Sequence, residues 1–127
     1  MASDTKIIIY RLGSPYISCS AFNYMSIDVR WEDENGKEIE VILSPRRSKF
    51  ETLIPDATVE WFPCLRYIDL YGDTTFNQLQ LPQLLADLKE AILEAESPET
   101  RNHMESLIDL VQRAIGRDHT YIKFYGD

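Results

Sequence analysis

Carboxylate side chains are concentrated in one short stretch of this sequence, WEDENGKEIE, which begins at Trp31. The stretch holds five acidic residues against one lysine, and they are Glu32, Asp33, Glu34, Glu38 and Glu40. On a rigid turn, such a group can enter a cationic cleft of another protein, for example the active site of a nuclease, and increase the rate and specificity of association. The same composition is typical of a solvated hairpin tip without a function. The sequence leaves both interpretations open, and the partner-binding hypothesis places the contact here.

A second set of acidic residues belongs to the tripeptide YGD, which occurs twice and ends at Asp73 and at Asp127. If the two segments are neighbours, these residues and Asp69 could bind a divalent ion or a basic partner. A calcium loop, however, carries dense alternating oxygen ligands that this stretch lacks, and Gly-Asp is an ordinary turn pair. We therefore predict turns and no metal site, and we count Asp69, Tyr71 and Asp73 among the partner-binding residues.

Motifs that would give the chain a chemistry of its own are missing from the sequence. The two histidines, His103 and His119, belong to no HExxH pattern, and His103 is expected on the polar side of a helix. Cys64 has no histidine near it, and no GxSxG, P-loop or GxGxxG pattern occurs. We predict no enzyme activity, no catalytic residue and no cofactor. The basic run at residues 45–49 is interpreted as a solvated loop.

The charge balance restricts the class of partner. The 127 residues include 13 basic and 21 acidic side chains, which give a net charge of −8. This charge repels phosphate backbones and anionic lipid and attracts basic surfaces. We therefore expect a basic protein partner, and neither direct nucleic-acid binding nor membrane binding.

Length and cysteine usage indicate a single domain over residues 1–127, because a chain of this size buries about two thirds of its unfolded surface. Cys19 and Cys64 lie far apart and lack the spacing of a metal or redox pair, which predicts two buried free thiols. The N-terminus is too polar for a signal peptide, and no window approaches the ~18 apolar residues of a membrane span. A cytoplasmic location is expected.

Hydrophobic periodicity predicts the strands that position these side chains. Alternation and β-branched composition indicate strands over residues 6–12, 25–32, 38–43, 66–71 and 121–125, with a further short strand considered over residues 58–62. Asn35-Gly36 predicts a type I′ turn between the second and third of these strands. Gly72-Asp73 predicts a turn after the fourth, with Asp73 capping the segment that follows.

Two amphipathic helices are predicted over residues 82–96 and 98–116, with Ser97 as the N-cap of the second and Gly116 at its end. Strands before the helices and one strand after them predict an α+β fold. The expected architecture is a mostly antiparallel sheet of four to six strands, packed on one face by a two-helix antiparallel hairpin. The other face of the sheet, with its tyrosines and acidic residues, would then be a contact surface.

The stretch IDLYGDTTFNQLQ, followed by a leucine-rich helix, and the terminal HTYIKFYGD resemble a group of small bacterial proteins of about this length. In size, acidity, cysteine usage and lack of catalytic motifs, the chain also resembles the immunity proteins of contact-dependent and polymorphic toxin systems. That resemblance implies a non-enzymatic protein that binds and blocks a cognate toxin domain, and it assigns no residues. The alternative hypothesis is a small-molecule or divalent-metal-binding regulatory module that uses the aspartates of the two YGD turns with Tyr71 and Tyr125.

Overall fold

The computed structural model describes residues 26–126 of the chain. The strand predicted over residues 6–12, Cys19 and Asp127 lie outside the described residues. The other predicted elements can be compared with the structure directly.

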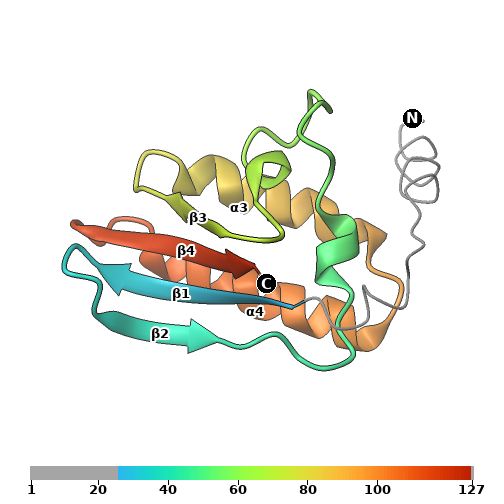
Figure 1. Cartoon of the computed structure of the whole chain (residues 1–127), viewed down its shortest axis with the longest axis horizontal. Coiled ribbons are helices and arrows are strands. Elements are labelled where there is room, and N and C mark those ends of the chain that lie inside the picture. The colour runs from blue at the N-terminus through green and yellow to red at the C-terminus, as the bar shows by residue number, and fades with distance from the viewer. Residues whose placement is uncertain (1–25, 127) are drawn as a thin grey trace.

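The described residues form one antiparallel sheet of four strands. The strands are β1 (Ile27–Asp33), β2 (Glu38–Ile42), β3 (Asp73–Phe76) and β4 (Thr120–Gly126). Their order is β2-β1-β4-β3, so the C-terminal strand lies between β1 and β3 (Figure 1). The predicted terminal strand is confirmed, and β4 pairs with β1 along its whole length and with all of β3.

Two helices cover one face of this sheet, as Figure 1 shows behind the strands. They are α3 (Leu81–Ala91), extended by a 3-10 turn at Ile92–Glu94, and α4 (Pro98–Ala114). The Ser97 side chain accepts a hydrogen bond from the Thr100 N–H, and Gly116 adopts a φ of +90°, so the predicted start and stop of the second helix are confirmed. The α+β fold and its helical hairpin are also confirmed. No helix within residues 26–126 is both long enough and apolar enough to cross a membrane.

The core lies between the helices and the covered face of the sheet. Alternation places Val29 and Trp31 of β1 and Ile122 and Phe124 of β4 on that face, where all four are buried. Leucines at spacings of three and four bring the apolar stripes of both helices onto the same layer. Buried side chains from all these elements form one contiguous cluster.

The strand predicted over residues 66–71 is wrong, because the chain forms a 3-10 helix at Leu65–Tyr67 and then a turn. The Asp69 carboxylate accepts the N–H of Tyr71 at 2.9 Å, and the Thr74 hydroxyl accepts the N–H of Asp69 at 2.9 Å. These local side-chain hydrogen bonds compete with strand pairing. The strand begins only at Asp73, which therefore does not cap a following segment.

Two further local predictions are corrected by the structure. Residues 58–62 form no strand, and Phe62 has a φ of 62°, which is incompatible with an extended chain. A type I′ turn requires positive φ at both central residues. Gly36 has positive φ and Asn35 does not, so the Asn35-Gly36 turn is not type I′. The Asp33 carboxylate accepts the N–H groups of Asn35 and Lys37, both at 2.9 Å, and stabilises the loop of residues 34–37 instead.

Candidate functional site

The five carboxylates of the acidic hairpin do not form one surface. The register of β1 and β2 shifts between Trp31 and Glu32, which changes the side of the sheet on which the acidic residues lie. Glu40 pairs with Trp31 and reaches toward the helices, whereas Glu32 and Glu38 lie with Arg30 on the open face.

On the helix side, Arg113 of α4 connects the hairpin to the helical layer. Its Nη1 and Nη2 donate to the two carboxylate oxygens of Glu40 at 2.8 and 2.9 Å, and its Nε donates to Asp109 at 2.8 Å. The hydrogen bonds from Arg113 lower the pKa of Glu40, and the same bonds raise the pKa of Arg113. Such a paired geometry holds both side chains in a fixed direction.

On the open face, Tyr125 lies at the centre of a polar network. Its hydroxyl donates to Glu32 at 2.5 Å, the Arg30 guanidinium lies 4.5 Å from its ring centroid, and the Lys123 ammonium lies 5.3 Å away. Burial and the bond to Glu32 raise the pKa of Tyr125. Arg30 also pairs with Glu38 at 3.0 Å. Glu32, at 7% exposure, is thus a buried hydrogen-bond acceptor for Tyr125 rather than a free surface charge.

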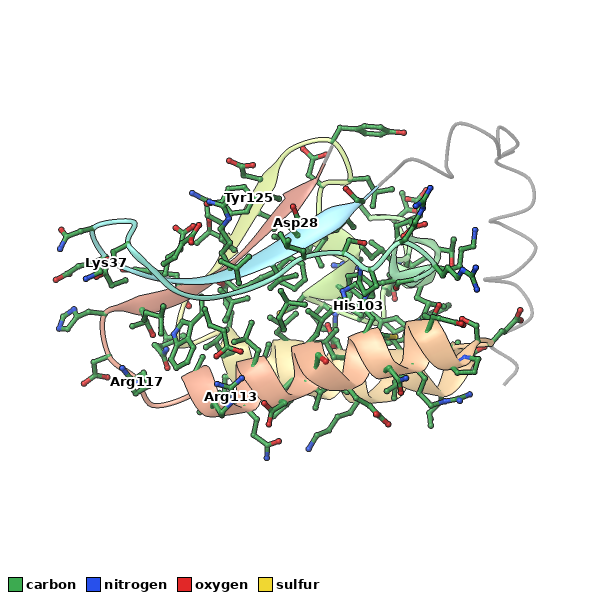
Figure 2. All side chains as sticks on the ribbon, turned by 90° about the horizontal axis from the view of Figure 1, so that it is seen from below. Asp28, Lys37, His103, Arg113, Arg117 and Tyr125 are labelled. Atoms are coloured by element: carbon green, nitrogen blue, oxygen red, sulfur yellow. The ribbon has the colours of Figure 1, made fainter. Side chains whose placement is uncertain are left out.

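The tip of the hairpin exposes fewer carboxylates than its sequence suggests. Asp33 uses one oxygen to close the turn, as described above. Glu34 lies 3.4 Å from the Nδ1 of His119, and both side chains are more than half exposed. Lys37 extends at the end of the hairpin in Figure 2. The exposed carboxylates are therefore those of Glu34 at the tip and Glu38 in the adjoining strand.

The described residues of the two YGD sequences, which exclude Asp127, lie side by side. Asp73 is paired with Tyr125 across β3 and β4, and the Gly126 N–H donates to the Gly72 carbonyl at 2.8 Å. A Cβ at Gly126 would collide with the backbone of Asp69 and Leu70, so the second glycine permits a close approach of two chain segments.

The predicted residues nevertheless fall into two groups. Tyr125 pairs with Asp28 near one end of β1, whereas Asp33 at the other end pairs with Thr120. Asp69, Tyr71 and Asp73 therefore lie at the far end of the sheet from the hairpin tip. Among residues 26–126, no three His, Cys, Asp or Glu side chains are placed to hold a metal ion.

A groove between β2 and α4 was missed at the sequence level. It has a volume of about 650 Å³ and is lined by Glu40, Val41, Ile42, Asn102, Glu105, Ser106, Asp109 and Arg113. The sequence carried a signal for it, because the α4 residues recur at helical spacing on the face opposite the apolar stripe. Its neighbour across the groove is β2, which carries Glu38 and Glu40.

The placement of His103 on a polar helix face is wrong. His103 is 3% exposed, and its Nδ1 lies 2.6 Å from the Ser48 hydroxyl, in a site between α4 and the sheet (Figure 2). Burial lowers its pKa to about 4, so the ring is neutral near pH 7. Ser48 is also buried and accepts the N–H of Phe50, so this pair joins the loop before the 3-10 helix at Phe50–Leu53 to α4. Cys64 is a buried free thiol, as predicted.

Comparison with protein-family models, with curated proteins and with solved structures finds no match for this chain.

Proposed function

We propose that this protein is a non-enzymatic inhibitor of the immunity type, which acts in the cytoplasm and binds a basic, nuclease-type toxin domain. The supporting observation is that hydrogen bonds hold the acidic hairpin in a fixed position. The Arg113 fork on Glu40 ties β2 to α4, and the turn is closed by Asp33, so the exposed carboxylates stand on a preorganised support. Preorganisation reduces the entropy that is lost when two proteins associate.

The exposed charges suit recognition more than catalysis. Glu34 and Glu38 keep 56% and 47% of their side chains exposed at and beside the tip, and Glu105 and Asp109 add two carboxylates on the neighbouring helix. With a net charge of −8, such a surface steers a cationic partner toward it and raises the association rate. Inhibitor complexes typically bury about 1,600 Å² in total, and the tight ones reach nanomolar affinity or better.

Co-expression with the product of the gene immediately upstream tests this proposal. We expect that product to arrest growth when it is expressed alone, to co-purify with this protein, and to lose its toxicity when both are present. A neighbouring product that is harmless alone and does not co-purify would contradict the proposal. The rescue assay is repeated with the variant that carries Glu34→Lys and Glu38→Lys, for comparison with the wild type.

A further inference from the structure

Strand β2 (Glu38–Ile42) is an edge of the sheet. Among residues 26–126 it pairs with β1 alone in the order β2-β1-β4-β3, so within this part of the chain one row of its main-chain N–H and C=O groups points away from the sheet. Ile39 at 40% exposure and Leu43 at 67% show that the strand and its exit are accessible. An extended segment of another chain can pair with such an edge as an additional strand.

The groove beside this edge gives the incoming segment a chemical requirement. Val41 and Ile42 contribute apolar surface on the strand side, and α4 contributes a polar wall. Three carboxylates line the groove, and the single cation there, Arg113, is bonded to two of them, Glu40 and Asp109. With Glu105 as the third carboxylate, the groove keeps a net negative charge. In a paired strand, alternate side chains would point into this groove and the others away from it. The groove therefore favours a segment with lysine or arginine at alternate positions.

The same charges disfavour a second copy of this protein as the occupant. Antiparallel pairing of two β2 edges would bring Glu38 and Glu40 of one copy toward the same acidic residues of the other. Like charges directly opposite each other destabilise strand pairing, and edge charges are a common protection against self-association. A cationic strand meets no such repulsion.

We propose that β2 binds an extended basic segment of the partner protein as an additional strand, with the cationic side chains of that segment in the β2–α4 groove. This inference rests on the proposed function, since it takes the partner to be basic, and it adds the site and the mode of contact. Main-chain pairing supplies affinity, and the groove carboxylates select the charge pattern.

A synthetic β-hairpin peptide, one strand of which alternates lysine with valine, tests the proposal. Matched peptides carry glutamate in place of lysine, or N-methyl groups on the outward amides of that strand. We expect the lysine peptide to bind, to slow amide exchange in β2, and to lose about tenfold or more in affinity on N-methylation or exchange to glutamate. The protein variant with Glu105→Lys and Asp109→Lys should lose a similar factor, whereas the control variant with Glu90→Lys and Glu94→Lys, outside the groove, should change the affinity by less than about threefold.

Three outcomes would overturn the inference: no binding by the lysine peptide, equal binding by its N-methylated form, or protection of amides elsewhere than in β2. None of these three outcomes would contradict the proposed function, which is tested by the co-expression experiment. If the upstream product forms a complex in which β2 amides exchange as fast as in the free protein, the proposed function stands and the additional strand is excluded.

Discussion

Arg113 donates two parallel hydrogen bonds to Glu40, so a residue of α4 holds strand β2 in place. Both side chains are partly exposed, at 44% and 39%, and water therefore screens their attraction. The pair acts mainly on the position of β2 relative to α4. Both residues line the groove, so the pair connects its two walls.

Replacement of Arg113 by glutamine should loosen β2 with little effect on the rest of the fold. We expect faster amide exchange in β2 and unchanged exchange in β4, which is central in the sheet. Exchange measured by NMR with and without 0.5 M salt would check this, because salt should reproduce part of the effect in the wild-type protein. Lys89→Gln on α3 is the matched control. Equal exchange rates in β2 of wild type and Arg113→Gln would contradict the role given to this pair.

Acid should destabilise the protein through His103. Its pKa is about 4 in the folded state and about 6.5 when exposed, so the unfolded chain binds more protons between these values. The stability contributed by the neutral ring is complete above pH 6.5 and is lost as pH falls toward 4. Between pH 7.5 and pH 5 the difference amounts to about 2 kcal/mol in the free energy of unfolding.

Urea unfolding of wild type and His103→Gln at these two pH values measures this contribution, because the other titrating groups cancel in the comparison. One such group is Glu51, whose pKa is raised by burial and which acts with the opposite sign. The variant should lose stability at pH 7.5 and show a weaker dependence on pH. An identical pH dependence in both proteins would show that His103 is not the group responsible.

The glycine of the second YGD should be more sensitive to substitution than a turn glycine. Gly126→Ala places a Cβ against the backbone of Asp69 and Leu70, which cannot move as a side chain can. Overpacking of this kind costs about 1–3 kcal/mol, and it should also shift the NMR resonances of residues 69–72. Gly36→Ala is the control, since its Cβ meets no atom and only the positive φ is strained. Unchanged resonances at residues 69–72 in Gly126→Ala would refute the close contact of the two segments.

Local signals explain which parts of the fold could be predicted. The helices, the Ser97 cap and the glycine stop depend on neighbouring residues, and all three are present. The alternation at residues 66–71 misled because a 3-10 turn and an Asx turn can produce the same pattern of burial as a strand. The environment of His103 could not be predicted, since its partner Ser48 is 55 residues away in the sequence.

The candidate site was predictable in composition and not in geometry. Acidic residues at the hairpin could be read directly, but the register shift beside Glu32 decides which of them face solvent. The role of Asp87 could not be predicted either, because its position in the helix does not indicate which groups its carboxylate contacts. Its carboxylate is buried and accepts the N–H groups of Cys64 and Leu65 at 2.7 and 3.1 Å, so it caps the 3-10 helix across the core.

Charge reversal at the hairpin should separate the approach of the partner from the stability of the complex. Glu34 and Glu38 are exposed and lie at the rim of the proposed surface, so they act mainly through long-range attraction. With both changed to lysine, the association rate with the proposed toxin partner at low salt should fall on the order of tenfold. The dissociation rate should change by less than about threefold, because rim contacts contribute little once water is excluded.

Surface plasmon resonance at several salt concentrations would measure both rates. Association of the wild type should slow as salt rises, since a Debye length of about 10 Å at 0.1 M screens exposed charges. The doubly reversed variant should show a much weaker dependence on salt. The control with Glu90→Lys and Glu94→Lys has the same net charge and should keep most of the wild-type association rate, because its changes lie on the α3 segment. If both variants slow equally, overall charge governs the encounter, and the hairpin has no special part in it.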